Sequence, residues 1–181
     1  MRLWQGERDG NGLRMKTMRC AIPLDESSVI YAATGAAVAA VAVIGSRAVA
    51  PDSRWYRSLH KPSWQPPSRA FGAVWSPLYV SIAWAGGHAL SNTRWRARRG
   101  LAISLGANLT LNAAWSWMFF GLRSPQAGLL ATVLLDVSNL ELLHRTARTD
   151  PPAALALLPY ATWCAFATAL SSSIARRNPS R

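Results

Sequence analysis

Uncharged and mostly apolar stretches dominate the chain, and the basic residues gather in the short segments between them. Four stretches of 20 to 25 residues contain no Asp, Glu, Lys or Arg. An α-helix rises about 1.5 Å per residue, so roughly 20 residues cross a hydrocarbon core of about 30 Å. A fifth stretch is interrupted by Asp136 and Glu141 but is otherwise rich in Leu, Val and Ala. It predicts a helix that must pack inside a bundle to shield those carboxyls.

The pattern therefore predicts an all-α membrane protein built as a bundle of five transmembrane helices. The expected spans are residues 27–49, 69–92, 100–121, 124–145 and 151–175, within one domain that covers residues 27–178. Residues 1–26 carry charges of both signs and lack an apolar core, so they predict a polar, poorly ordered tail and not a cleaved signal peptide.

The charge balance bears on the choice of partner. Twenty Lys and Arg residues against eight Asp and Glu residues give a net charge of +12, which would also suit a nucleic-acid-binding protein. Such a protein lines one stripe or groove with its basic residues, whereas here they lie at the ends of the predicted spans, where lipid headgroups are. We therefore expect a lipid bilayer as partner and no nucleic acid. Basic residues are more numerous on the side of the membrane that holds the N-terminal tail, but the other side has more when the tail is left out. The orientation in the membrane therefore stays open.

The cysteines and histidines indicate no obligatory cofactor and no metal site. Cys20 lies in the predicted tail and Cys164 in the last span, and neither has a partner at metal-binding spacing. His60 could bind a heme iron, although a loop histidine beside Lys61 is more often solvated. Asp136 would lie near the middle of the bilayer, so we expect it to be protonated or hydrogen-bonded to Asn139 or to a neighbouring helix, as a strut.

The segment between the first two spans, residues 50–68, is rich in proline and aromatic residues. Its prolines prevent a continuous helix, and they are Pro51, Pro62, Pro66 and Pro67. Its rings favour the membrane interface, and they are Trp55, Tyr56 and Trp64. The segment is either a plain interfacial anchor or a lid folded over the helix ends. Four prolines favour the lid, because an anchor needs no fixed shape.

Three helical stripes predict a cavity inside the bundle. They are Phe71, Trp75 and Tyr79 in the second span, Asn108, Asn112 and Trp115 in the third, and Tyr160, Trp163 and Ala167 in the fifth. Each stripe alone is more often packing than a site. An unpaired amide in hydrocarbon costs several kcal/mol, so the two Asn residues must face inward. Flat rings with a few hydrogen-bonding groups suit a large, planar, mostly apolar ligand.

The other side of the third span carries small residues at every fourth position. They are Ala102, Gly106, Thr110 and Ala114. Small residues at this spacing let helices approach closely, so this face predicts a homodimer.

Several motifs together resemble the tryptophan-rich sensory protein/translocator protein family, also called TspO/MBR or peripheral-type benzodiazepine receptors. They are Trp55-x5-Lys-Pro-x-Trp-x-Pro-Pro-x3-Phe-x3-Trp-x3-Tyr79, Leu111-Asn-Ala-Ala-Trp115, Phe119-Phe-Gly121 and Pro159-Tyr-x2-Trp-x3-Ala-Thr-Ala-Leu170. The resemblance covers about residues 28–178. It implies a five-helix bundle, often dimeric, that binds porphyrins and, in animals, cholesterol and drugs. By resemblance the ligand contacts would be Trp64, Phe71, Trp75, Asn112, Trp163 and Ala167, with Tyr79 and Tyr160 close by.

The chain departs from the family pattern at three places. Ser63 stands where a second loop Trp is common, and Ser171 stands where Asn is usual. Ser172 and Ser173 occupy the place of the Tyr in the proposed cholesterol pattern, which argues against sterol binding.

Three functions follow as alternatives, all in a membrane that we expect to be bacterial. The first is a protein that binds porphyrin, heme or another tetrapyrrole for sequestration, transport or regulation. The second is a light-dependent porphyrin-degrading enzyme in which Trp64 or Trp163 relays a radical, although no catalytic acid–base pair is recognisable. The third is a membrane assembly protein without a ligand.

Overall fold

Five long helices form the protein, and no strand occurs in the part of the chain that the structure describes. In this computed structural model the described residues are 25–179, so the predicted tail and Cys20 lie outside them. The helices are α1 (Glu26–Ser46), α3 (Ser68–Asn92), α4 (Trp95–Ser116), α5 (Pro125–Thr149) and α6 (Pro151–Arg177), with a short α2 (Arg54–Ser58) and a π-helical turn η1 (Trp117–Gly121).

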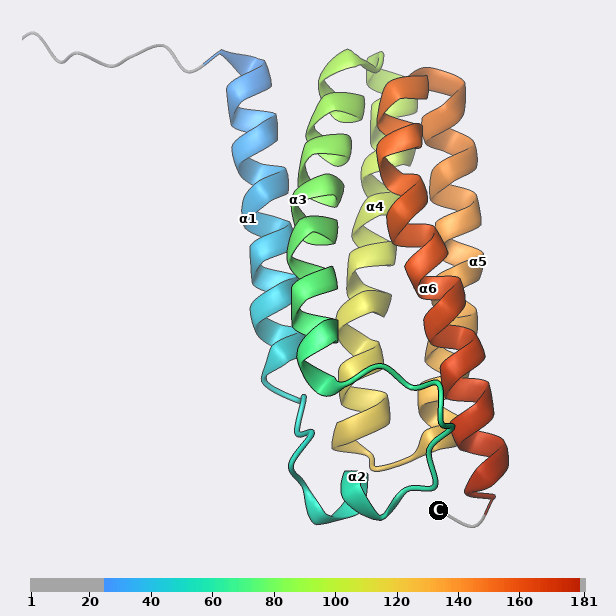
Figure 1. Ribbon diagram of the computed structural model, residues 1–181. Helices are drawn as coiled ribbons and strands as arrows, with labels where there is room; N and C mark the ends of the chain where they lie inside the picture. Colours follow the sequence, from blue (N-terminus) through green and yellow to red (C-terminus); the bar gives the residue numbers. More distant parts are fainter. Residues whose placement is uncertain (1–24, 180–181) are drawn as a thin grey trace, which may run out of the picture.

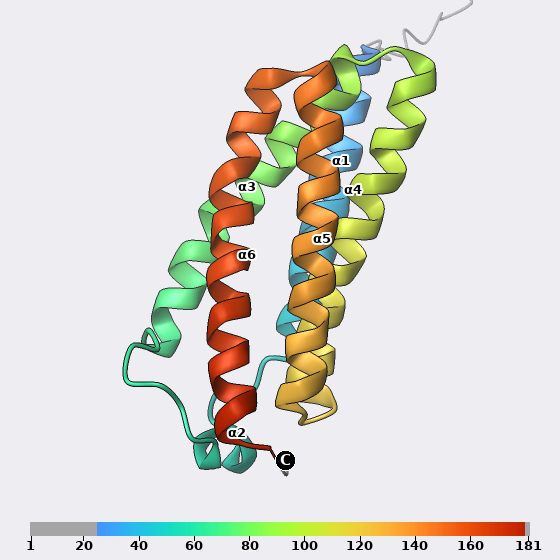
Figure 2. The ribbon, with the colours of Figure 1, turned by 90° about the vertical axis from the view of Figure 1, so that its right-hand side faces the viewer.

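The long helices pack as a closed ring in the order α1, α3, α6, α5 and α4. Figures 1 and 2 show them side by side along a common direction, with α2 and its flanking loop crossing one end of the bundle. The all-helical bundle with five long helices is thus confirmed. By length and composition, α1, α5 and α6 qualify as membrane spans among the described helices. Helices α3 and α4 are not among them, and in α4 the buried amides of Asn108 and Asn112 lower the mean hydropathy.

The helices differ from the predicted spans mainly at their ends. Helix α1 stops at Ser46, three residues before the predicted end, whereas α4 begins at Trp95, five residues before the predicted start. Arg96, Arg98 and Arg99 are therefore helical. The stem of an arginine can lie along a helix while its guanidinium reaches the headgroups, so a charge does not end a helix.

Local sequence accounts for where the helices begin. Helix α5 starts with Pro125, and the hydroxyl of Ser124 accepts a hydrogen bond of 3.2 Å from the amide of Ala127. Helix α6 starts with Pro151, and the carboxylate of Asp150 accepts one of 3.1 Å from the amide of Ala153. Proline at the first helical position after a capping side chain satisfies free amides and sets the backbone for the helix. Asp150 alone joins α5 to α6, and because these helices pack side by side they run antiparallel (Figure 1).

A polar cluster fastens α3 to the α5–α6 turn, at the end of the bundle away from α2. Nδ1 of His88 lies 2.5 Å from Oδ2 of Asp150, and the ring of Trp84 stacks on His88 at 4.8 Å. Burial raises the pKa of Asp150, but hydrogen bonds from the Ala153 amide, His88 and Asn92 outweigh it and bring the pKa below its ordinary value. The carboxylate thus stabilises this end of the fold in its ionised form.

Helix α4 ends in the wide turn η1, which directs two phenylalanines toward the loop. The amide of Leu122 donates to the carbonyl of Trp117 at 2.9 Å, five residues earlier, which is the π-helical pattern. Phe119 is buried at 3% exposure and packs edge-on against Trp55 and Tyr56. The turn therefore joins the helix ends to the loop.

Gly128 of α5 is required where Phe119 packs. A Cβ added at Gly128 would lie 2.4 Å from Cδ2 of the Phe119 ring. We expect Gly128→Ala to destabilise the protein by about 1–3 kcal/mol, because a ring held on several sides cannot withdraw. A lower midpoint of thermal unfolding in detergent would show it. Gly35→Ala is the matched control, because nothing lies within 4 Å of its added Cβ, and it should not lower the midpoint.

Candidate functional site

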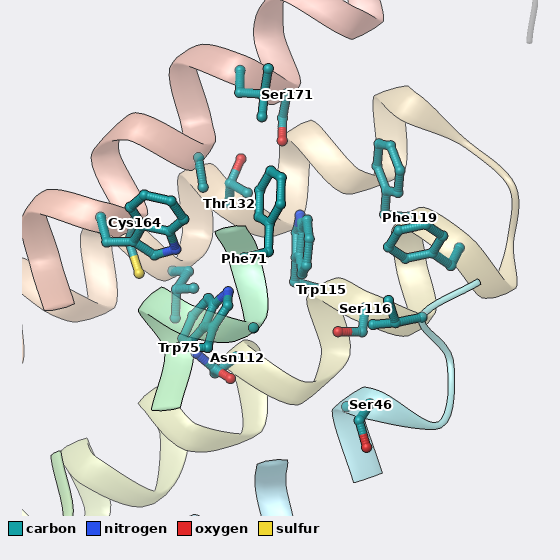
Figure 3. Close-up of a pocket in the computed structure, with 18 of the residues that line it drawn as sticks. Ser46, Phe71, Trp75, Asn112, Trp115, Ser116, Phe119, Thr132, Cys164 and Ser171 are labelled. Atoms are coloured by element: carbon teal, nitrogen blue, oxygen red, sulfur yellow. The ribbon is translucent and has the colours of Figure 1, made fainter. Parts of the chain in front are cut away.

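A cavity of about 380 Å³ lies within the ring of helices, at the end that α2 and its loop cover. Side chains of α1, α3, α4, α5 and α6 form its wall, together with Pro51 of the loop and Tyr56 of α2. Figure 3 shows Phe71, Trp75 and Trp115 gathered around this space, with the sulfur of Cys164 beside them. A mostly apolar wall with a few polar groups is typical of small-molecule sites of this size.

The predicted ligand-binding residues are the stripe residues other than Asn108, together with Trp64, and seven of these nine belong to this wall. They are Phe71, Trp75, Tyr79, Asn112, Trp115, Trp163 and Ala167. The rings contact one another: Trp75 stacks on Tyr79 with centroids 5.2 Å apart, and Phe71 meets Trp163 edge-on at 5.9 Å. The helical stripes of the sequence thus converge on one space.

The other two predicted residues lie outside the wall. Trp64 is 49% exposed on the outer side of the loop and packs edge-on against Phe166 at 5.8 Å. Tyr160 is 1% exposed and lies behind Asn112, to which it is hydrogen-bonded. Trp64 therefore covers the bundle from outside, whereas Tyr160 supports the wall from behind.

A chain of hydrogen bonds leads from the cavity into the bundle and links four helices. The hydroxyl of Tyr79 donates to Oδ1 of Asn112 at 3.2 Å, and Nδ2 of Asn112 donates to Oη of Tyr160 at 3.1 Å. Tyr160 then donates to Oδ1 of Asn108 at 2.9 Å, and Asn108 donates to Oδ1 of Asn139 at 2.8 Å. Each group in the chain satisfies the next, so the amides predicted to face inward have their partners.

One buried polar group in the wall lacks a partner. Nε1 of Trp115 is buried and has no hydrogen-bond partner among the described residues. In Figure 3 the hydroxyls of Thr132 and Ser171 are drawn on the same side of the cavity as the Trp115 ring nitrogen. An unpaired buried donor costs about 1–3 kcal/mol, which a hydrogen-bond acceptor on a ligand would recover. The wall therefore offers a donor to such an acceptor.

The loop lies over the helix ends as a lid, as its prolines predicted. Leu59 is 5% exposed and packs with Phe119, Leu170 and Ile174. The side chain of Asn178, in the C-terminal segment, makes two hydrogen bonds of 3.1 Å with the backbone of His60. Its Oδ1 accepts from the His60 amide, and its Nδ2 donates to the His60 carbonyl. His60 itself is an exposed residue of the lid and does not line the cavity.

Tyr56 is the lid residue whose ring closes the cavity. Nε2 of Gln65 donates to its hydroxyl at 3.0 Å, and the ammonium of Lys61 lies 3.8 Å from the centre of its ring. Burial raises the pKa of Tyr56 and outweighs the hydrogen bond from Gln65, and burial lowers the pKa of Lys61. The phenol therefore stays neutral, and a cation–π contact holds it in place.

Several residues of the cavity wall were not predicted from the sequence as ligand contacts. They include Gly45, Ser46, Phe119, Phe120, Thr132 and Ser171. Small residues of α1 carry no pattern that separates a wall from ordinary packing. Phe119 and Phe120 belong to a family motif, but their direction depends on the π-helical turn, which the sequence did not reveal.

Asp136 forms the interhelical strut that its position predicted. The hydroxyl of Thr168 on α6 donates to Oδ2 of Asp136 on α5 at 2.6 Å, so the partner is a hydroxyl of a neighbouring helix and not Asn139. Asp136 is half-buried and is not part of the cavity wall. Within the described residues, no group of three or more His, Cys, Asp or Glu could hold a metal ion.

Two substitutions at Asp136 distinguish a structural role of its hydrogen bond from a functional role of its negative charge. Asp136→Asn retains an acceptor for Thr168, so we expect unchanged thermal stability and porphyrin affinity. Asp136→Leu removes the acceptor and should lower stability by about 0.5–1.5 kcal/mol with a small effect on affinity. Both are measured by thermal unfolding and porphyrin titration in detergent. Loss of binding in Asp136→Asn alone would mean that the charge itself is functional.

Comparison with known proteins places these features in a family. The model of the TspO/MBR family matches residues 33–177. The chain is 39% identical over 131 residues to the tryptophan-rich protein TspO of Chlorobaculum tepidum, covering 71% of this chain and 82% of that protein. It is 37% identical over 145 residues to the human translocator protein, covering 75% and 82%. It is also 37% identical over 129 residues to protein CrtK of Rhodobacter capsulatus, covering 69% and 79%.

Proposed function

Because the chain belongs to the TspO/MBR family and is an integral membrane protein, we propose that it binds a planar lipophilic tetrapyrrole, such as a porphyrin or heme, in the cavity under the lid. The aromatic wall carries this proposal. Trp75, Trp115 and Trp163 all border the space, and rings in offset or edge-on contact with a flat macrocycle are favourable beyond the area they bury. Sequestration, transport or regulation of the tetrapyrrole would each use such a site.

The polar groups of the wall support a ligand with a few acceptor atoms on an apolar body. No Asp, Glu, Lys, Arg or His is among the residues that line the cavity within the described part of the chain. A carboxylate of the ligand placed deep in the cavity would therefore lack a counter-charge, and an unpaired charge is costly in an apolar environment. A ligand would place its uncharged face against the rings, near the donor of Trp115.

A porphyrin titration tests the proposal. Protoporphyrin IX is added to the protein in detergent while the fluorescence of the nine tryptophans is followed. We expect saturable quenching with one porphyrin per chain. Quenching that never saturates, or that is the same with an unrelated helical membrane protein, would contradict a specific site and favour an assembly protein without a ligand.

Light-dependent porphyrin degradation is the second candidate, because three tryptophans border the cavity. Trp163 lies in the wall, whereas Trp64 does not, so Trp163 is the better-placed radical relay of the two named candidates. Illumination of the protein with excess protoporphyrin distinguishes the functions: a binding protein leaves the porphyrin intact, whereas an enzyme turns over more than one porphyrin per chain. Trp163→Phe should stop turnover if that ring is the relay.

We propose that the small-residue stripe of α4 pairs with a second copy of the chain. Ala102, Gly106 and Thr110 are exposed and Ala114 is half-buried, and no atom lies within 4 Å of a Cβ added at Gly106. Two such faces could approach closely in the bilayer.

Gly106→Leu tests the pairing. A leucine there separates the backbones, so we expect a dimer to become a monomer in light scattering in detergent, with porphyrin affinity retained because Asn112 faces the cavity. Gly35→Leu is the control, because it also adds bulk where nothing lies within 4 Å. An unchanged mass of Gly106→Leu would exclude this face as the interface.

A further inference from the structure

A groove runs along the outside of the bundle between α3 and α6. Val74 and Leu78 of α3 form one wall, and Leu155, Leu158, Thr162 and Phe166 of α6 form the other. Leu155 is 65% exposed and Leu158 is 46% exposed. These residues belong to membrane-spanning helices, so lipid chains face the groove.

Trp163 separates the groove from the cavity. Among the described residues it is the only one that lines both hollows. Its ring meets Phe71 of the cavity wall edge-on at 5.9 Å and stacks on Phe166 of the groove wall at 5.1 Å. Trp163 therefore lies at the boundary between the two hollows.

Both helices beside the groove carry a proline within their length. Pro159 lies one turn before Trp163 in α6 and lines the groove, and Pro77 lies within α3 next to Leu78. A proline inside a helix removes a backbone hydrogen bond, and helices bend most readily at such points. Each wall of the groove thus has a point at which its helix bends readily.

At the opposite end of the cavity, hydrogen bonds and apolar contacts hold the lid in place. His60 and Asn178 are joined by two hydrogen bonds, and Leu59 is buried among rings and aliphatic side chains. A ligand entering past the lid would also have to leave the hydrocarbon core of the bilayer for the aqueous interface, where a lipophilic molecule is less stable.

We infer that lipophilic ligands pass between the bilayer and the cavity through the α3–α6 groove, with Trp163 as the gate. This inference rests on the proposed tetrapyrrole site. It adds the direction of access, which is lateral from the membrane, and it selects ligands that partition into lipid.

Filling the groove tests the route without touching the cavity. Leu158→Trp and Thr162→Trp place bulk in the groove, and neither residue lines the cavity. Binding and release of protoporphyrin IX are followed by its own fluorescence after rapid mixing with protein in lipid nanodiscs. We expect both rates to fall about tenfold with Kd unchanged, because an obstructed path raises one barrier for both directions. Leu134→Trp is the matched control, since Leu134 is 44% exposed on α5, and it should leave both rates unchanged.

Trp163→Ala provides an independent readout if a groove variant fails to fold. If Trp163 only contacts the bound porphyrin, its loss should speed porphyrin release and leave association unchanged. If it is the gate, its loss should speed association as well. Normal binding with unchanged rates in the groove variants, or unchanged association in Trp163→Ala, would overturn the route and leave the site intact. Absence of saturable binding in the unmodified protein would instead remove the site itself.

Discussion

Replacing Trp75 by alanine is expected to weaken the binding of protoporphyrin IX about tenfold or more while the protein stays folded. Trp75 borders the cavity, stacks on Tyr79 at 5.2 Å and meets Tyr160 edge-on at 6.1 Å. A stacked ring contributes about 0.5–1.5 kcal/mol beyond its buried area, and 1.4 kcal/mol corresponds to a factor of ten in Kd. Fluorescence titration and circular dichroism measure affinity and helical content.

Trp84 supplies the matched control on the same helix. It is 43% exposed, stacks on His88 and is not part of the cavity wall. Trp84→Ala removes the same ring from the other end of α3, so porphyrin affinity should be unchanged. Equal loss in both variants, or none in Trp75→Ala with normal helical content, would contradict the assignment of the cavity.

Replacing Asn112 by alanine is expected to lower both stability and porphyrin affinity. The change leaves the Tyr79 hydroxyl without its acceptor and Tyr160 without its donor, and Tyr160 is fully enclosed. Groups left unpaired in a buried network each cost about 1–3 kcal/mol. The midpoint of thermal unfolding and the Kd for protoporphyrin IX report the two effects.

Tyr160→Phe tests the hydrogen-bonded chain without changing the cavity wall, because Tyr160 lies behind the wall. It removes one hydroxyl that makes two of the buried hydrogen bonds, whereas Tyr79→Phe removes a hydroxyl that makes one. We expect Tyr160→Phe to be the more destabilising of the two. If Tyr160→Phe leaves stability unchanged, the hydrogen-bonded chain does not hold the helices together.

The fold was largely predictable because a bilayer allows few solutions. Backbone groups in hydrocarbon must be paired, so uncharged stretches of sufficient length imply helices, and Asp136 implies an inward polar partner. The partner of Asp136 required the structure, because Asn139 and Thr168 were both compatible with the sequence. The helix ends also required it, because Arg96 and its neighbours extend α4 beyond the uncharged segment.

The cavity was predictable where helical periodicity decides the direction of a side chain. Phe71, Trp75 and Tyr79 share one face of α3 by spacing alone, and all three border the cavity. Trp64 lies in a loop, where no periodicity exists, and its ring packs on the outer side. Phe119 depends on the π-helical turn at the end of α4, which shifts the face that follows it.

The indole N–H signals of the tryptophans test the central claim most directly. A porphyrin shifts the resonance of nearby protons strongly, so nitrogen-15 spectra with and without protoporphyrin IX report which tryptophans the ligand approaches. The account predicts large shifts for Trp75, Trp115 and Trp163 and none for Trp84 and Trp95, which are exposed. Shifts confined to the exposed tryptophans, or none at a saturating porphyrin concentration, would contradict a tetrapyrrole site in the cavity.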